Sequence, residues 1–341
     1  MKLKTFHHFF LPAIILISTL AACTSKQDYE DRINKQYTWT TLHRFVVEKN
    51  GISTATISDS SITLVYRNEL SRYDFSGKLI DSDSLTDIQY IYRYYGGDST
   101  YWVDEFPSLH HVIKKYNNKK ELQTERKIET LSDIMYMGND RFIIPDLDTT
   151  SNTYVMKFYD AHQDSVLKEI NIGKLLGTKD TLSIHKGAIT FTNRFSKNAS
   201  GDVLAYYRYN SSFIVIDSNF VATAYQDFRK LPVGIPSLKG HNVLLTPLNC
   251  GIENGSMDNE FIYLITPTYQ CKQWQNSRFE RTMDVYAKSS KKYIGSISFP
   301  LEKDTYLISF AQTSAGFVVV YSKDSETEIV IYDGKFLQLF R

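Results

Sequence analysis

The chain has 341 residues, with 39 basic and 38 acidic side chains and a formal net charge of +1. This balance provides no strong electrostatic field, so we expect no nucleic-acid partner. Sixteen glycines and eight prolines are too few for a collagen-like or low-complexity chain. The 24 tyrosines and 20 phenylalanines suit pleated, half-buried surfaces, which favours strands over helices.

Residues 1–22 have the pattern of a secretory signal peptide. Lys2 and Lys4 give a positive start, and the apolar run from Phe9 to Leu20 is too short for an ordinary membrane span. The run ends in Leu-Ala-Ala-Cys, which resembles the lipobox of bacterial lipoproteins. The resemblance implies cleavage before Cys23 and lipidation of its thiol, which would hold the protein on a membrane. The alternative is a plain secretory signal that happens to contain a cysteine.

Residues 23–36 are polar and charged, and we expect them to form a flexible tether between lipid and domain. Residues 37–341 are then predicted to form one β-propeller domain. These features together predict a lipid-anchored protein of the bacterial cell envelope. We expect the outer membrane, with either the periplasmic or the cell-surface face as its location.

One motif recurs along the domain. It is an apolar strand that ends in Tyr or Ile, usually followed by Asp, then a polar turn and a second strand. Copies begin at positions 73, 116, 159, 216, 286 and 332. Repeats of about 40–50 residues are typical of propeller blades. Short runs with a period of two, such as Ile62–Tyr66 and Phe317–Tyr321, indicate strands in each unit.

The repeats predict an all-β fold, a β-propeller with six blades of four antiparallel strands. The units are expected at Ile52–Leu85, Asp87–Ile128, Leu131–Ile172, Leu182–Phe228, Ile235–Pro300 and Thr305–Phe340. A blade exposes apolar faces that it cannot bury alone, and a closed ring buries them against neighbours. The alternative is seven blades, which would require a hidden blade in Tyr37–Lys49 or in the long fifth unit.

Three finer expectations follow from the same pattern. We expect the ring to close between the two termini, with the strand-like segment Tyr37–Val47 adding to the outer edge of the last unit or pairing elsewhere in it. The last unit is expected to have its own fourth strand at Lys335–Phe340. The first strand of the fourth unit is expected at Ala188–Asn193.

The lipobox, the short tether and the units that end in hairpins such as Tyr73–Asp81 resemble the six-bladed TolB-like or NHL-like propeller lipoproteins of Bacteroidota. Many of these are described only as domains of unknown function. The resemblance implies a fold and an envelope location, and it carries over no catalytic residues.

Cys250 and Cys271 are the two cysteines that remain besides Cys23. Exported proteins are oxidised, so the pair is a candidate disulfide. A bridge across about twenty residues would contribute roughly 3 kcal/mol on a chain-entropy estimate. The alternative is two buried free thiols.

The fifth unit also carries polar and aromatic residues beyond the needs of a blade. Trp274, Arg278, Phe279 and Arg281 are residue types that anchor interfaces, and they form a candidate binding loop. The alternative is a tolerated loop insertion.

Tyr90, Tyr92 and Tyr94 alternate along one predicted strand and could stack against a sugar, although packing between blades explains them more simply. The sequence contains no nucleophile elbow, zinc-protease, phosphate-loop or dinucleotide motif. We therefore assign no catalytic residue, metal ligand or cofactor. The leading hypothesis is a binding or scaffold module for a protein or glycan partner. The alternative is a propeller hydrolase or lyase that acts on glycan or peptide with residues gathered around the channel.

Overall fold

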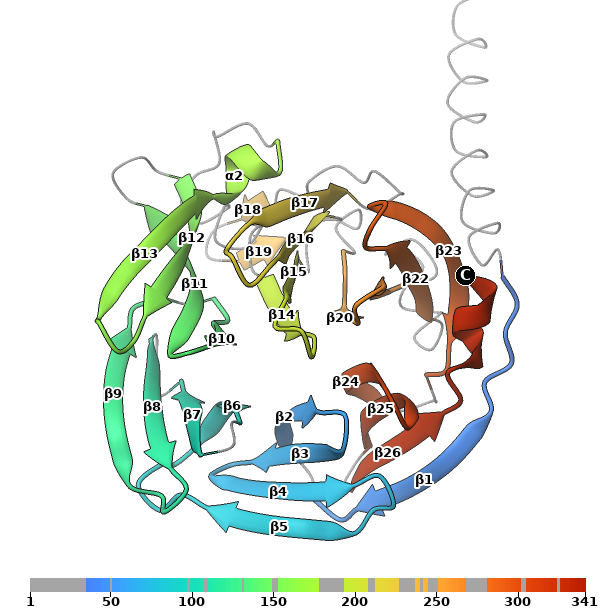
Figure 1. Ribbon diagram of the computed structural model, residues 1–341, viewed down its shortest axis with the longest axis horizontal. Coiled ribbons are helices and arrows are strands. Elements are labelled where there is room, and N and C mark those ends of the chain that lie inside the picture. The colour runs from blue at the N-terminus through green and yellow to red at the C-terminus, as the bar shows by residue number, and fades with distance from the viewer. Residues whose placement is uncertain are drawn as a thin grey trace, which may run out of the picture.

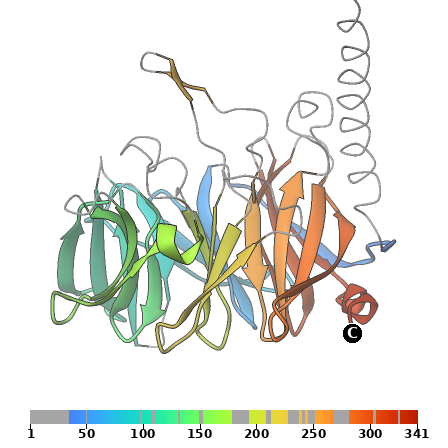
Figure 2. The same ribbon diagram turned by 90° about the horizontal axis from the view of Figure 1, so that it is seen from above.

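Six four-stranded antiparallel sheets surround a central axis, which confirms the six-bladed β-propeller (Figure 1). The computed structural model describes residues 35–49, 51–96, 99–106, 110–130, 132–148, 153–177, 193–207, 212–226, 237–239, 242–244, 251–267, 281–301, 305–323 and 326–341. Seen edge-on in Figure 2, the blades form a disc. Among these residues no helix is both long and apolar enough to cross a membrane.

The strands of each blade run from the channel outward in chain order. Blade 1 contains β2 (Ile52–Ile57), β3 (Ser61–Tyr66), β4 (Glu69–Asp74) and β5 (Leu79–Ser84). Blade 2 contains β6 (Ile91–Tyr95), β7 (Thr100–Glu105), β8 (His111–Asn117) and β9 (Leu122–Ile128). Blade 3 contains β10 (Met135–Gly138), β11 (Arg141–Asp148), β12 (Thr153–Asp160) and β13 (Ser165–Asn171), and is followed by the one-turn helix α2 (Ile172–Leu175).

The remaining blades follow the same order except at the closure. Blade 4 contains β14 (Asn193–Lys197), β15 (Val203–Tyr207), β16 (Ser212–Ile216) and β17 (Ala222–Gln226). Blade 5 contains β20 (Asn254–Met257), β21 (Phe261–Pro267), β22 (Arg281–Ala287) and β23 (Lys292–Phe299). Blade 6 contains β24 (Tyr306–Thr313), β25 (Gly316–Lys323), β26 (Glu326–Tyr332) and, from the other end of the chain, β1 (Thr41–Val47).

Burial concentrates in the two middle strands of each blade. In β25 the run Phe317–Tyr321 is fully buried, as expected for a continuous β-branched and aromatic strand covered on both faces. Apolar clusters lie at all six blade junctions. Representative pairs are Val65 with Val103, Ile113 with Phe142, Phe158 with Ile214, Phe213 with Ile262, Tyr263 with Val319, and Leu64 with Val318. The ring is therefore held by apolar contacts on every side.

In blades 1 to 5 the recurrent motif is the turn between the third and fourth strands, as predicted. In blade 1 the Asp74 carboxylate accepts backbone N–H groups of Ser76 and Lys78 at 2.9 and 3.0 Å. Equivalent side chains in the next three blades do the same, namely Asn117, Asp160 and Asp217. These side chains satisfy amides that the tight turn leaves without a strand partner, because Asp and Asn can mimic a backbone turn.

Strand β1 closes the ring, as expected. It pairs antiparallel with β26, from Val47 opposite Thr327 to Thr41 opposite Tyr332. Its Phe45 also reaches blade 1, where a Cβ placed on Gly77 would lie 2.8 Å from the Phe45 ring. Closure of a propeller by the first and last segments joins the chain ends through a β ladder, so the ring cannot open without breaking backbone hydrogen bonds.

The predicted fourth strand at Lys335–Phe340 is wrong. Residues Lys335–Leu339 form the 3₁₀ helix η2 instead. The outer edge of β26 is already occupied by β1, so no backbone partner remains there for a further strand. Phe336 of η2 is fully buried in the apolar cluster between blades 5 and 6, which explains the apolar character of this segment.

The long unit between blades 4 and 5 is not a seventh blade in the part that the structure describes. It contains a two-stranded hairpin, β18 (Ser237–Lys239) and β19 (Asn242–Leu244), which stands clear of the disc face in Figure 2. The first strand of blade 4 begins at Asn193, where the predicted strand was to end, and residues 188–192 lie outside the described residues.

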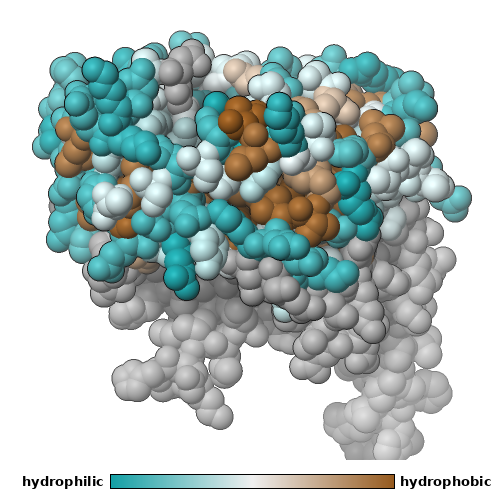
Figure 3. All heavy atoms as spheres, turned by 90° about the horizontal axis from the view of Figure 1, so that it is seen from below, coloured by the Kyte–Doolittle hydropathy of each residue, from teal (hydrophilic) through white to brown (hydrophobic). Residues whose placement is uncertain are grey.

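The outer rim at β1 and β5 is mixed in character. Leu42, Val46, Leu79 and Ile80 are exposed there, and Figure 3 shows apolar areas separated by hydrophilic residues on this side. Charged neighbours on an edge strand, such as Asp81 of β5, oppose pairing with another chain.

Trp39, which precedes β1, packs against aromatic residues near the closure of the ring. Trp39 lies with its ring centroid 5.1–5.3 Å from those of Phe317, Tyr332 and Phe336, and its indole N–H donates to the Ser298 carbonyl at 2.7 Å. We expect Trp39→Ala to lower the free energy of unfolding by about 3 kcal/mol, because it empties a contact shared by blades 5 and 6.

Urea unfolding followed by circular dichroism measures this change. The control is Thr38→Ala, at an exposed neighbouring position, where we expect a change within about 0.5 kcal/mol. Equal unfolding midpoints for the two variants would show that Trp39 does not stabilise the closure.

Candidate functional site

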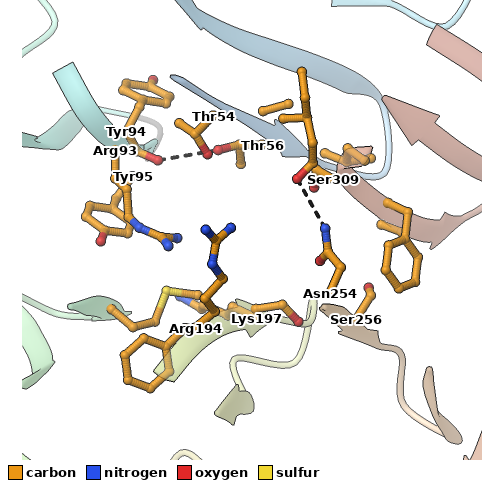
Figure 4. A pocket seen from close by; sticks show the side chains of 18 of the residues that line it. Thr54, Thr56, Arg93, Tyr94, Tyr95, Arg194, Lys197, Asn254, Ser256 and Ser309 are labelled. Carbon is orange, nitrogen blue, oxygen red and sulfur yellow. Dashed lines mark hydrogen bonds between the residues drawn. The ribbon is translucent and has the colours of Figure 1, made fainter. Parts of the chain in front are cut away.

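The innermost strands of all six blades line a central channel. It contains a cavity of about 330 Å³, a size typical of pockets for small ligands. Most of its lining comes from β2, β6, β10, β14, β20 and β24. Figure 4 shows side chains from several of these strands pointing into one space. The channel is therefore the place where distant parts of the sequence meet.

Two of the inner strands are rich in small and polar residues, in contrast to the buried middle strands, whereas β6 (IYRYY) and β10 (MYMG) carry aromatic and Met side chains. Strand β2 reads ISTATI and β20 reads NGSM. Small residues are required where inner strands approach neighbouring blades. A Cβ added to Gly255 would lie 2.9 Å from the Tyr206 ring. The hydroxyl and amide side chains of β2 and β20 are suited to a wall that faces a polar space.

Hydrogen bonds from side chains connect each blade to the next around this wall. They include Ser53 Oγ to Ile91 O (3.0 Å), Tyr95 Oη to Ile134 O (2.8 Å), Lys197 Nζ to Met137 O (3.0 Å), Tyr206 Oη to Asn254 Oδ1 (3.2 Å), Asn254 Nδ2 to Ile308 O (3.3 Å) and Ser314 Oγ to Asp59 O (3.2 Å). Two of these bonds involve Asn254, whose amide joins blades 4, 5 and 6. The channel wall is thus fixed by the fold rather than by a ligand.

Three cationic side chains face the channel. They are Arg93 of β6, and Arg194 and Lys197 of β14. Figure 4 shows the Arg93 and Arg194 guanidinium groups side by side in the cavity, with the Arg194 side chain extending into the open space. The described residues that line the channel include no Asp, Glu or His. Within the described ranges, neither Arg194 nor Lys197 forms an ion pair, so the channel presents an excess of positive charge.

Arg93 differs from the other two cations because it has a carboxylate partner behind the wall. Its Nη2 donates to Asp133 Oδ2 at 2.5 Å, and the Tyr92 hydroxyl donates to the other carboxylate oxygen. Burial alone would raise the pKa of Asp133, but the charges of Arg93 and Arg194 and the Tyr92 hydrogen bond hold that pKa below its usual value. Asp133 is therefore an anionic anchor that orients Arg93.

Lys197 is an exposed residue that lines the channel, but its ammonium group contacts the protein wall. Its Nζ lies 5.3 Å from the centroid of the Tyr136 ring and donates to the Met137 carbonyl. This partial burial lowers the pKa of Lys197. The ring face and the carbonyl together hold the ammonium at the blade 3 side of the channel.

A second buried polar pair lies inside blade 2. His111 Nδ1 and Asp104 Oδ1 are 2.8 Å apart, and both side chains are at most 1% exposed. Burial raises the pKa of Asp104 to about 6, against the opposing effects of its hydrogen bond with His111 and of nearby Arg93. The Phe106 ring lies 4.7 Å from the His111 ring. This pair does not line the channel, so it acts as part of the support for β6 rather than as part of the site.

Most candidate residues from the sequence lie outside the described residues. These are Cys23, Cys250, Cys271, Trp274, Arg278 and Phe279. Arg281 is described. It is the first residue of β22, only 7% exposed, and its Nε lies 2.5 Å from Glu253 Oε2. In this position Arg281 holds the start of β22 to the segment before β20.

The channel cations were missed by the sequence prediction, which considered Arg93, Arg194 and Lys197 only as part of the overall charge balance. The sequence contained one weak indication that these cations face the channel. Arg93, Arg194 and Lys197 each fall in the first strand of a predicted or observed blade, the strand that faces the axis. Tyr94, which was considered for sugar stacking, lines the channel. Its ring centroid also lies 5.6 Å from that of Tyr101, so Tyr94 contacts both the channel and the interior of blade 2.

Comparisons with known proteins support the fold. No protein-family model and no curated protein matches the chain. A DUF4221 family member from Bacteroides vulgatus aligns at a TM-score of 0.50 with 9% identity, over 87% of this chain and 98% of that one. A Bacteroides fragilis protein described as exported aligns at a TM-score of 0.47 with 10% identity, over 86% of this chain and 93% of that one. The Pan2 WD40 domain of Neurospora crassa aligns at a TM-score of 0.47 with 10% identity, over 86% of this chain and 94% of that one. At such identities the first similarity shows a shared fold alone.

The low pKa of Asp133 predicts a pH-dependent contribution to stability. In the unfolded chain the pKa of Asp133 is about 4. The ion pair of Asp133 therefore stabilises the fold above about pH 4, and this contribution is lost as the pH falls through the lower pKa of the folded state. We expect Asp133→Asn to lower the free energy of unfolding at pH 7 by about 3 kcal/mol, because it leaves Arg93 without a charged partner.

Urea unfolding from pH 7 down to pH 3 tests this prediction. The difference between wild type and Asp133→Asn should shrink below about pH 4. Asp81→Asn, which removes an exposed partner of Arg72, should change stability by about 0.5 kcal/mol or less. A wild-type and Asp133→Asn difference that stays constant with pH would contradict the assigned ion pair.

Proposed function

We propose that this chain is a lipid-anchored binding module of the bacterial envelope whose ligand, a protein segment or a glycan, enters the central channel. The observation that carries this proposal is the composition of the channel wall. Six inner strands present hydroxyls, an amide and three cations around a cavity large enough for a small ligand. Concave sites with a few convergent polar groups are the usual form of ligand sites.

The wall favours binding over the alternative of hydrolysis. Glycoside hydrolysis commonly uses two carboxylates on either side of the scissile bond, one as general acid. The described channel lining offers hydrogen-bond donors and positive charge, and its side chains include neither a carboxylate nor an imidazole. Such a wall can hold and orient a ligand, and its described side chains do not include the pair of carboxylates that glycoside hydrolysis commonly uses.

The anchor is the second part of the proposal. The Leu-Ala-Ala-Cys sequence at positions 20–23 and the polar tether after it support lipidation of Cys23. A propeller held close to a membrane by a short tether would meet envelope components at high effective concentration. We propose the outer membrane as the anchoring site, and the propeller as the part that recognises a partner.

A bulky residue in the channel tests the ligand site. We expect Thr56→Trp to abolish binding to ligands found on an array of bacterial glycans and peptides, because Thr56 lines the channel and an indole would fill part of the cavity. Ser218→Trp places the same indole on an exposed outer turn and should leave binding unchanged. Circular dichroism verifies that both variants retain the propeller. Equal binding by both variants, or turnover of a bound compound, would contradict the proposal.

Metabolic labelling tests the anchor. We expect Cys23→Ala to lose incorporation of radioactive palmitate and to prevent release of the mature chain, because the lipidated thiol is absent. Cys250→Ala should still be labelled. Labelling of Cys23→Ala at the wild-type level would show that the lipid is not attached at this cysteine.

A further inference from the structure

We propose that the channel recognises a small sugar acid, with its carboxylate held between Arg93 and Arg194 and its hydroxyl groups facing the serines and threonines of the wall. This inference rests on the proposed function, since it names the ligand class of the same site. A hexuronate is the simplest molecule with this chemistry.

The first observation is the orientation of the two arginines. Arg93 belongs to blade 2 and Arg194 to blade 4, and Figure 4 shows their guanidinium groups side by side in the cavity. Two neighbouring cations repel one another, and the single charge of Asp133 offsets only part of this repulsion. A planar carboxylate matches the donor fork of a guanidinium and can accept from both groups.

The second observation is the fixed position of Arg93. Asp133 occupies one edge of its guanidinium through Nη2. The Nε of Arg93 is buried and has no hydrogen-bond partner among the described residues. Arg194 is exposed to the channel and forms no ion pair with a described residue. The site thus combines one oriented cation with one that can adjust to the ligand.

The third observation is the balance of charge. Arg93, Arg194 and Lys197 contribute three positive charges, and Asp133 behind the wall contributes one negative charge. The channel is partly screened from water, where the attraction between an anion and these cations exceeds that at an open surface. A neutral ligand of the same shape gains nothing from this field.

The fourth observation concerns the neutral part of the ligand. The hydroxyls of Thr54, Ser256 and Ser309 line the channel and form no hydrogen bond with any described residue. The hydroxyl of Ser196 is buried and likewise unpartnered in the described chain. Hydroxyls both donate and accept, as the hydroxyls of a sugar require. The volume of about 330 Å³ suits one or two sugar rings and is small for a folded peptide segment.

Isothermal titration of the full chain in mild detergent tests the proposal with defined probes. Glucuronate and galacturonate are the acidic sugars, and glucose and galactose are their neutral counterparts. Sodium phosphate and N-acetylaspartate separate a general oxyanion or acidic-peptide site from a sugar-acid site. We expect at least one uronate to bind, with affinity that falls as salt rises, and we expect the neutral sugar to bind about tenfold more weakly or not at all.

Arg194→Gln supplies the matched variant, because Arg194 forms no ion pair with a described residue, so its removal should not disturb the fold. We expect uronate affinity to fall about tenfold or more. Arg72→Gln removes a surface arginine on β4, paired with Asp81, and should bind uronate as the wild type does. Equal affinity of Arg194→Gln and Arg72→Gln would overturn the proposal.

The outcomes also separate this inference from the proposed function. Tighter binding of phosphate or N-acetylaspartate than of any uronate would overturn the sugar-acid class. Absence of uronate binding, together with array ligands that Thr56→Trp abolishes, would overturn the ligand class and leave the binding module intact. Array binding that Thr56→Trp leaves unchanged would overturn both proposals.

Discussion

The apolar packing between neighbouring blades is the interaction on which the rest of this structure depends. Each four-stranded sheet exposes two faces, and its middle strands carry β-branched and aromatic residues on both. Such a sheet cannot remain in water alone, and burial of a large apolar side chain contributes about 1.5–3 kcal/mol. Six junctions bury all of these faces only when the ring is complete. Closure by β1 is therefore a condition of stability and not an addition to a finished fold.

The innermost strands take only a partial role in this packing. Ile91 and Phe310 belong to the apolar clusters between blades, while other positions of the same strands face the channel. The inner strands are also linked to adjacent blades by hydrogen bonds, such as those of Ser53 and Asn254. An exposed residue such as Arg194 can then face the channel without an ion pair to the described part of the fold. Function can vary there while the ring remains the same.

The sequence predicts the fold well because its strongest signals are local. An Asp or Asn after a strand reports the turn that follows, whatever the rest of the chain does. The motif is irregular because the residue with positive φ differs between turns. It is Gly77 in blade 1, but Lys120 in blade 2 and Phe220 in blade 4. The pattern of Asp and Asn is more constant than the glycine, and it located the hairpins.

The sequence fails where the answer depends on contacts between distant residues. Lys335–Phe340 is rich in Phe and Leu and was predicted to be a strand, but β1 already occupies the edge that such a strand would need. The channel is harder still to predict. Arg93 and Arg194 lie about a hundred positions apart, and each is an ordinary basic residue in its own segment. Only the angular position of blades 2 and 4 in a ring of six brings them to the same cavity.

The environment of Arg93 explains how a buried charge can serve a site without weakening the fold. A carboxylate such as Asp133 at 9% exposure would be costly alone, and a guanidinium beside it repays part of that cost. Tyr92 satisfies the second carboxylate oxygen, so Asp133 needs nothing further from the channel. The pair therefore fixes Arg93 before any ligand arrives. Arg194 forms no ion pair with a described carboxylate and acts on Asp133 only through its charge. For the anion that we propose, an oriented Arg93 would lower the entropic cost of binding, and the exposed Arg194 would supply the second positive charge.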